Sequence, residues 1–160
     1  MRYWLVKSEP DCFSFADLMR APKRTTGWDG VRNYQARNFM RDDMRVGDGV
    51  LFYHSSAPPP AIAGIAEVAR AAYPDPTQFD TKSEYFDPKA SKDAPTWMQV
   101  DVRGVKPLAE PLTLDRLRKV PELDGMELLK KGSRLSVQPV TEGEWSAIME
   151  LAGLAWPNGS

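Results

Sequence analysis

The feature that most constrains the fold is a series of short strand-like segments separated by short helical ones. Alternating or apolar residues predict strands at 3–7, 50–54, 62–72, 98–106 and 135–137. Along 62–72, alternation places Ile62, Gly64, Ala66 and Val68 on one face. Capping residues and helical spacing predict short helices after Ser14, over 33–43, after Thr113 and from Thr141. This order lacks the regular alternation that builds a doubly wound sheet. The sequence therefore predicts an α+β domain around a curled mixed sheet or small barrel of about five to six strands.

Length and charge limit what such a domain does. At 160 residues the chain is expected to form one domain over residues 1–153, followed by a short tail at 154–160. It has 21 Lys and Arg against 22 Asp and Glu, so its formal net charge is -1. This balance argues against a protein that coats nucleic acid through a large basic surface. It allows a protein that grips a nucleotide in a pocket with a local basic rim.

Cysteine, histidine and apolar runs give further exclusions. The single Cys12 forms no disulfide within the chain, and with His54 it supplies too few ligands for an all-Cys/His zinc site. The N-terminal MRYWLVKSEP lacks a signal-peptide core, and no apolar run approaches the ~20 residues that span a bilayer. We expect a monomer without metal, cofactor or membrane anchor, located in the cytoplasm or, in a eukaryote, the nucleus.

The sequence gives little support for an enzyme. It contains no GxGxxG, GxxxxGK[ST], HExxH or CxxC motif. Cys12 and His54 are candidates for a nucleophile and its base, but no third residue is visible that would orient them. Cys12 is better explained as a small buried apolar residue. His54 ends a predicted strand, where either a structural histidine or a ligand contact is expected. No residue is therefore assigned a catalytic role.

The stretch TTGWDGVRNYQARNF, at 25–39, gives the strongest indication of a ligand site. Trp28 lies in a glycine-flanked turn outside any helical or strand period, so its ring is predicted either to plug the turn or to stack on a base. Asn33 has the donor and acceptor that suit a base edge, but it is equally placed to cap the next helix. Ala36, Phe39 and Met40 are spaced to face the core.

Two groups of basic residues are candidates for phosphate contacts. Arginines recur near four-residue spacing from Arg32, and a second group begins at Lys130. If the groups converge they form a small phosphate rim, for which the candidates are Arg32, Arg41, Lys130 and Lys131. The alternative is an ordinary solvated face, because aspartates partly neutralise the first group.

Seven blocks of the sequence resemble the EVE domain family, in the same order and over nearly the whole chain. They are YWLVKSEP at 3–10, TGWDGVRNYQARNFMR at 26–41, VGDGVLFYHS at 46–55, GIAEV at 64–68, AYPDPTQFD at 72–80, YFDPK at 85–89 and RLSVQPVT at 134–141. The resemblance implies a PUA-like fold, a curled mixed β-barrel flanked by short helices. It also implies kinship with the YTH domains, which hold a methylated adenine of RNA in an aromatic cage.

The resemblance further implies a pocket for a modified base, either 5-modified cytosine in DNA or a modified base of RNA. Capture of this kind needs a flipped or unpaired nucleotide. The resemblance places Trp28 against the face of the base and leaves the second aromatic wall open among Tyr85, Phe86 and Trp97. The other residues that it places in the pocket are Lys7, Ser8, Asn33, Tyr34, Arg37, Tyr53, His54, Ser55, Arg134 and Ser136.

These observations leave more than one functional hypothesis. The favoured one is a non-enzymatic module that binds nucleic acid or a nucleotide carrying a modified base. The first alternative is an enzyme that acts on a modified nucleoside or RNA, with His54 or Glu9 as its general acid or base. The second is a regulatory module that binds a protein partner through an exposed apolar loop at 79–86.

Overall fold

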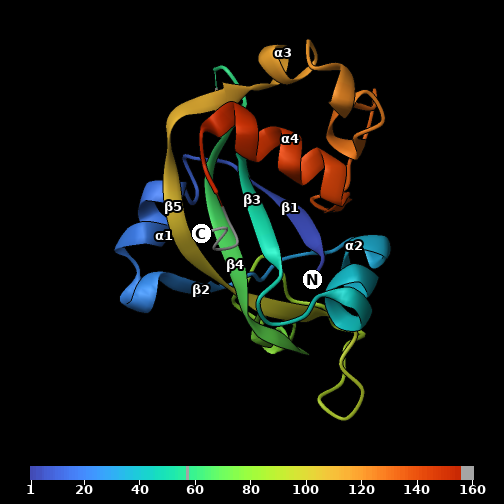
Figure 1. Cartoon of the computed structure of the whole chain (residues 1–160). Helices are drawn as coiled ribbons and strands as arrows, with labels where there is room; N and C mark the ends of the chain where they lie inside the picture. Colours follow the sequence, from blue (N-terminus) through green and yellow to red (C-terminus); the bar gives the residue numbers. More distant parts are fainter. Residues whose placement is uncertain (57, 156–160) are drawn as a thin grey trace.

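The computed structural model describes residues 1–56 and 58–155, which form a curled six-stranded mixed sheet with short helices around it (Figure 1). The strands are β1 (Tyr3–Ser8), β2 (Thr25–Gly27), β3 (Gly49–His54), β4 (Ala61–Pro74), β5 (Met98–Thr113) and β6 (Val137–Val140). Their order across the sheet is β2-β5-β4-β3-β1-β6, with β1 and β3 parallel and the other neighbours antiparallel. The predicted α+β class and curled mixed sheet are confirmed. Residues 156–160 of the predicted tail lie outside the described residues.

Side-chain caps fix where the helices begin. The helices are α1 (Phe15–Arg20), α2 (Tyr34–Asn38), α3 (Leu114–Leu117) and α4 (Glu142–Ala152). Each is preceded by a residue whose side chain accepts a hydrogen bond from a first-turn amide: Ser14, Asn33, Thr113 and Thr141. Thr141 and Glu144 form a capping box at the start of α4. The helix predicted over 33–43 is divided, because a π-helical turn at Phe39–Asp43 follows α2. No helix in the described part of the chain is long and apolar enough to cross a membrane.

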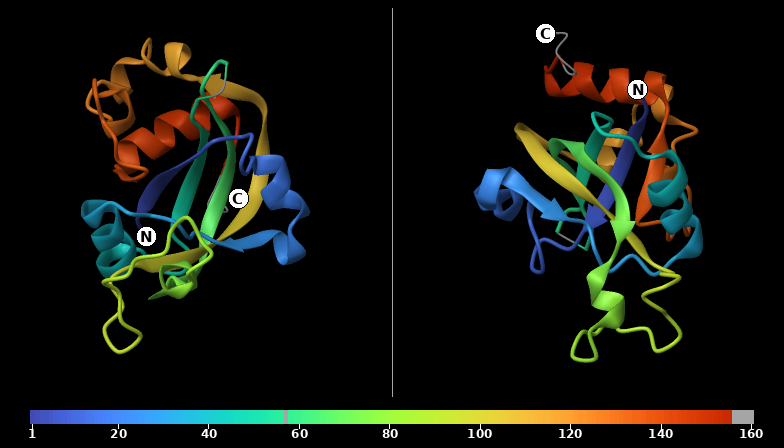
Figure 2. Two further views of the ribbon diagram at one scale, coloured as in Figure 1. Left: turned by 180° about the vertical axis from the view of Figure 1, so that it is seen from behind. Right: turned by 90° about the horizontal axis from the view of Figure 1, so that it is seen from below.

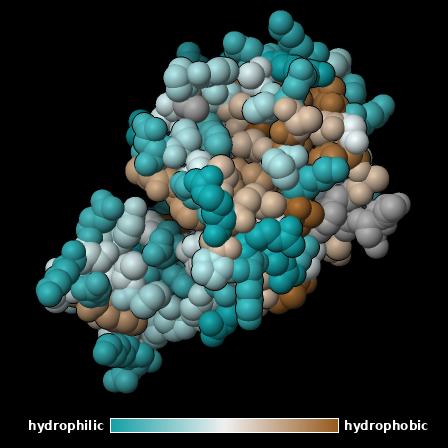
Figure 3. All heavy atoms as spheres, turned by 90° about the vertical axis from the view of Figure 1, so that its left-hand side faces the viewer, coloured by the Kyte–Doolittle hydropathy of each residue, from teal (hydrophilic) through white to brown (hydrophobic). Residues whose placement is uncertain are grey.

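The two faces of the sheet carry separate hydrophobic cores. Alternation along β1 sends Trp4 and Val6 to the first core and Leu5 to the second. The first core also takes apolar residues from α1 and α2, and the second takes them from α3 and α4. Figure 2 shows α4 lying across one side of the sheet, away from α1. In Figure 3, hydrophobic atoms gather in the middle of the upper half of the face seen from the β5 side, and hydrophilic atoms predominate in the lower half.

Two glycines of the sheet allow α1 to pack closely. A Cβ atom at Gly64 would lie 2.4 Å from the Phe15 ring, and one at Gly104 would lie 2.5 Å from the Met19 sulfur. A larger residue at Gly64 would displace the Phe15 ring, whereas the flexible Met19 side chain can move away from a larger residue at Gly104. The seating of α1 also fixes the loop between β1 and α1, which contributes to the site described below.

The structure corrects several details of the predicted strands. No strand was predicted at residues 25–27, just before the Trp28 turn, but they form β2, which pairs with residues 101–103 of β5. The strand expected at 98–106 continues to Thr113, and the strand expected at 135–137 lies at 137–140. Ile62 was expected to share a face with Ala66, but it lies in the second core with Ile65. A register shift between Ile62 and Gly64 explains this, since one displaced residue reverses the alternation.

Candidate functional site

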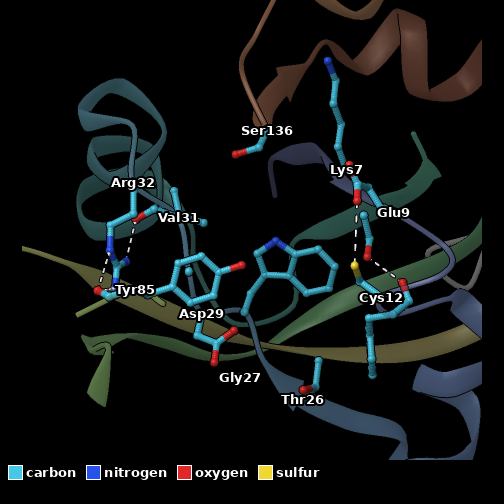
Figure 4. Close-up of a pocket in the computed structure, with 14 residues that line it drawn as sticks. Lys7, Glu9, Cys12, Thr26, Gly27, Asp29, Val31, Arg32, Tyr85 and Ser136 are labelled. Atoms are coloured by element: carbon cyan, nitrogen blue, oxygen red, sulfur yellow. Dashed lines mark hydrogen bonds between the residues drawn. The ribbon is translucent and has the colours of Figure 1, made fainter. Parts of the chain in front are cut away.

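A cavity of about 440 Å³ opens at the edge of the first core (Figure 4). It is formed by the end of β1, the β1–α1 loop, the turn between β2 and α2, the long loop after β4, and the chain just before β6. The lining residues are Lys7, Ser8, Glu9, Cys12, Phe13, Thr26, Gly27, Trp28, Asp29, Gly30, Val31, Arg32, Tyr85 and Ser136. Segments distant in sequence thus converge on a space large enough for a small organic group.

Trp28 belongs to both the core and the pocket. Its backbone amide extends the β2–β5 pairing by donating to the Val100 carbonyl at 2.7 Å. Its ring is only 8% exposed and meets Phe52 and Phe13 edge to face, with centroid distances of 5.4 and 6.4 Å. Its indole N–H has no hydrogen-bond partner among the described residues. The ring therefore plugs the turn, as one interpretation of the sequence held, and still lines the cavity.

Tyr85 is the aromatic residue of the long loop that lines the cavity. Its ring lies against the backbone of Gly30, where a Cβ atom would stand 2.7 Å from the ring. Gly30 has a φ of +77°, so the turn needs glycine for its conformation as well as for space. The Tyr85 side chain is 36% exposed, and its hydroxyl points into the pocket in Figure 4. Of the three aromatics considered for the second wall, Tyr85 alone lines this cavity.

Arg32 fastens the Tyr85 loop to the turn. Its guanidinium donates to the Tyr85 carbonyl at 2.9 Å and forms an ion pair with Asp75 at 3.1 Å. Asp75 is fully buried and also accepts from the Gly30 amide at 2.9 Å. Arg32 lies over the rings of Tyr85 and Trp97, at 5.4 and 5.1 Å from their centroids. The residue predicted for the phosphate rim is therefore tied to internal partners.

A second aromatic cluster, formed by Tyr34, Arg37 and Trp97, lies outside the cavity lining. Tyr34 and Trp97 stack with their centroids 4.9 Å apart, and the Arg37 guanidinium lies 4.9 Å from the Tyr34 centroid. Arg37 also donates to the Thr96 carbonyl at 2.9 Å, and the Trp97 indole N–H donates to Asp87 at 2.8 Å. These side chains contact one another, and the structure does not bring them to the cavity.

Asn33 and His54 have structural partners. The Asn33 side-chain oxygen accepts from the Ala36 amide at 2.9 Å, so its capping interpretation is confirmed.

His54 Nε2 accepts from the Phe15 amide at 3.0 Å. This bond requires a neutral imidazole, and burial lowers the pKa of His54. Because Nε2 is occupied, His54 is poorly placed to act as a base for Cys12. Cys12 was expected to be buried but is exposed, with its thiol 3.7 Å from a Glu9 oxygen.

The β1–β6 wall of the cavity is polar. The Lys7 amide donates to the Ser136 carbonyl at 2.9 Å, which joins the strands there. The Ser8 hydroxyl donates to the Phe13 carbonyl at 2.5 Å. Burial lowers the pKa of Lys7, against a weaker opposite effect of Glu127. The structure therefore brings Lys7, Ser8 and Ser136 together with Trp28 and Tyr85, as expected for one site.

The remaining predicted residues lie outside the cavity lining. Tyr53 is buried in the second core, Arg41 pairs with Asp42 at 2.8 Å, and Lys130 pairs with Glu127 at 3.3 Å. The others are Asn33, Tyr34, Arg37, His54, Ser55, Phe86, Trp97, Lys131 and Arg134. Within residues 1–56 and 58–155, no group of three or more His, Cys, Asp or Glu side chains is arranged to hold a metal ion.

The predicted base pocket left out several lining residues, of which Glu9 and Cys12 had been named only as candidates for catalysis. They are Glu9, Cys12, Phe13, Thr26, Gly27, Asp29, Gly30 and Val31. The signal for some of them was present, because the Asp29-Gly30 pair is typical of a tight turn with positive φ. Residues 9–13 gave no such signal, since only the packing of α1 on the sheet brings that loop to the pocket.

Comparisons with known proteins agree on one family. The sequence model of the EVE domain matches residues 2–151. Thymocyte nuclear protein 1 of Homo sapiens is 42% identical over 166 residues, which cover 93% of this chain and 73% of that protein. An uncharacterized protein of Schizosaccharomyces pombe is 35% identical over 94% of this chain and 68% of its own length.

Solved structures give the same result. A crystal structure of a Pseudomonas putida protein has a TM-score of 0.89 and 53% identity, covering 94% of this chain and 99% of that one. The human THYN1 protein was crystallised in complex with DNA containing 5-methylcytosine. That structure has a TM-score of 0.89 and 39% identity, covering 97% of this chain and 99% of the other.

Proposed function

Because the chain belongs to the EVE domain family, we propose that it is a non-enzymatic module that binds a modified base of DNA, of the 5-methylcytosine type, in the cavity lined by Trp28 and Tyr85. The observation that carries the proposal is the close similarity to human THYN1, whose structure contains DNA with 5-methylcytosine. A modified base of RNA is the second candidate ligand. Residues 1–153 act in this proposal as one monomeric unit, in the cytoplasm or, in a eukaryote, the nucleus.

The chemistry of the cavity fits a nucleobase that has left its stack. A base presents two flat apolar faces and a polar edge, and the cavity offers the rings of Trp28 and Tyr85 beside polar groups. The base must be flipped or unpaired, because a stacked base cannot enter a pocket. Base–aromatic stacking contributes about 1–3 kcal/mol per base, which helps to offset the cost of unstacking.

The charges favour a pocket over an extended DNA-binding surface. Arg32 and Arg37 bind loop carbonyls, and Arg41 is paired with its neighbour Asp42. Lys7 and Arg32 are the cationic side chains that line the cavity. With a net charge of -1, the protein is expected to make few phosphate contacts and to bind with a shallow salt dependence.

The two alternatives have less support. An enzyme would need a general acid or base in the cavity, and His54 is bound to the Phe15 amide instead of lining it. Glu9 lines the cavity and leaves this alternative open to test. A protein partner would contact the exposed Tyr85 and Phe86 of the long loop, and Tyr85 also lines the cavity.

The test is a titration with short single- and double-stranded DNA and RNA oligomers that differ at one base. Cytosine, 5-methylcytosine and 5-hydroxymethylcytosine occupy the same position in otherwise identical strands, and each is measured at two salt concentrations. We expect saturable binding that prefers a modified cytosine and weakens only slightly with salt. Equal binding of modified and unmodified strands contradicts the proposal. Conversion of the base during prolonged incubation would establish the enzyme alternative.

A further inference from the structure

Asp29 lines the cavity from the turn that follows β2. It follows Trp28 in the turn, and its own amide donates to the Gly27 carbonyl at 3.0 Å. Within residues 1–56 and 58–155, no other side chain donates a hydrogen bond to its carboxylate or forms an ion pair with it. Figure 4 shows the carboxylate beneath the Tyr85 ring, on the side of the cavity formed by the turn.

The surroundings of Asp29 do not compensate its charge. Its pKa is raised, first by the desolvation that comes with its place in the pocket and then by the neighbouring Asp75 carboxylate. A hydrogen bond from the backbone amide of Asp29, and then the Arg32 charge, lower the pKa with a smaller effect. Arg32 is already engaged by Asp75 and by the Tyr85 carbonyl. Among residues 1–56 and 58–155, the pocket thus presents a carboxylate to which no side chain donates a hydrogen bond.

The other polar groups of the cavity are differently placed. Glu9 already accepts from the Cys12 thiol, and the Ser8 hydroxyl is directed to the Phe13 carbonyl. The Trp28 indole N–H and the Lys7 ammonium are donors. The hydroxyls of Thr26, Tyr85 and Ser136 both donate and accept, so Asp29 is the lining carboxylate that offers a ligand amine an acceptor beside the tyrosine ring.

Given the function proposed above, on which this step depends, we propose that Asp29 makes the pocket selective for bases with an exocyclic amine. Cytosine carries an N4 amine, and a carboxylate is a suitable acceptor for it. Thymine has the same ring and the same 5-methyl group as 5-methylcytosine but presents a carbonyl oxygen at position 4. Against that oxygen the Asp29 carboxylate stays unpaired and faces a second acceptor, which disfavours binding.

The test compares two DNA oligomers that differ only in having 5-methylcytosine or thymine at one unpaired position. The ratio of their dissociation constants is measured by fluorescence anisotropy for the wild type, for Asp29→Asn and for Asp93→Asn. Asp93 is an exposed carboxylate of the long loop that does not line the cavity, so its variant is the matched control. Thermal unfolding of each variant checks that it is folded. The ratio of the two dissociation constants does not change if part of a protein sample is inactive, because both oligomers are measured with the same sample.

We expect the wild type and Asp93→Asn to prefer 5-methylcytosine by roughly 5- to 100-fold. The preference should fall toward unity in Asp29→Asn, because an amide turns a donor as readily as an acceptor toward position 4. An unchanged ratio in Asp29→Asn overturns the assignment of Asp29 and leaves the proposed function intact. Failure of the wild type to bind either oligomer overturns both.

Discussion

The pocket and the cluster formed by Tyr34, Arg37 and Trp97 are built from the same kinds of residue. The pocket combines Trp28 and Tyr85 with Arg32, and the cluster likewise combines a tryptophan, a tyrosine and an arginine. They differ in what covers the aromatic faces. In the cluster, the Tyr34 ring stacks on Trp97 and lies under Arg37. The Tyr85 ring also lies under an arginine, Arg32, but it stands beside a cavity of about 440 Å³ instead of stacking on a second ring.

The difference teaches that residue type alone does not mark a binding site. An arginine beside an aromatic is expected in a nucleic-acid pocket, but it is equally expected where a loop is fastened to a domain. Arg32 shows the second role, since it binds the Tyr85 carbonyl and the buried Asp75. Contacts that are already filled within the protein are unavailable to a ligand.

The largest effect is expected for Trp28→Ala, which removes a side chain that serves both core and pocket. Its ring packs against Phe52 and Phe13, so we expect the free energy of unfolding to fall by roughly 3–5 kcal/mol. Urea unfolding monitored by circular dichroism measures this. Trp28→Phe should lose less. A loss below about 1 kcal/mol would contradict the core role of the ring.

Arg32→Met should cost about 2–3 kcal/mol of stability, because it leaves the buried Asp75 without its ion-pair partner. The matched control is Arg41→Met, which breaks an exposed pair with Asp42 and should cost less than about 1 kcal/mol. Binding should also weaken in Arg32→Met, since the Tyr85 loop loses its attachment. Equal, small losses in both variants would show that Arg32 does not fasten the loop.

Tyr85→Ala separates an effect on binding from an effect on stability better than Trp28→Ala does, because Tyr85 is 36% exposed and lies outside the buried core. We expect it to weaken binding of an oligomer with 5-methylcytosine by about 1–3 kcal/mol, with little change in stability. Tyr34→Ala is the control, because Tyr34 is an exposed tyrosine, 60% accessible, that stacks on Trp97 outside the cavity lining. If Tyr85→Ala and Tyr34→Ala bind the oligomer with the same affinity, the base does not distinguish the cavity from the cluster of Tyr34, Arg37 and Trp97.

The smallest effect concerns pH and His54. Burial lowers the pKa of His54 in the folded protein below its ordinary value of 6.5, so the unfolded chain takes up the proton first as the pH falls. The contribution of His54 to stability is therefore fully present above pH 6.5 and is lost as the pH falls below it. Unfolding of wild type and His54→Gln across this range measures the difference. A loss of the same size in both proteins would contradict the structural role of His54.

Local rules of sequence predicted the parts of the fold that depend on neighbouring residues. Ser14, Asn33, Thr113 and Thr141 cap helices, and each accepts its hydrogen bond from an amide at most three residues away. The prediction that Ile62 shares a face of the sheet with Ala66 was wrong. The register shift that reverses its direction depends on pairing with β5, which the local sequence does not show. Sequence reasoning therefore succeeded where a few adjacent residues decide the conformation.

The candidate site was predictable only in part for the same reason. The resemblance included Trp28, Lys7, Ser8 and Ser136, all of which line the cavity. The resemblance could not choose among the aromatics of the long loop. The position of the Tyr85 ring depends on its contact with Gly30 and on the hydrogen bond from Arg32 to the Tyr85 carbonyl. Those contacts join segments more than 50 residues apart, since Arg32 and Tyr85 are separated by 53 positions.

The most direct test of base capture is to follow the tryptophan indole N–H signals by NMR while a strand with one unpaired 5-methylcytosine is added. The signal that disappears in Trp28→Phe belongs to Trp28. The indole of Trp97 reports on the cluster of Tyr34, Arg37 and Trp97, and that of Trp145 reports on the second core. We predict that the Trp28 signal shifts and saturates with one equivalent of strand, while the Trp97 and Trp145 signals stay in place. Binding that leaves the Trp28 signal unmoved would contradict capture of the base in this cavity.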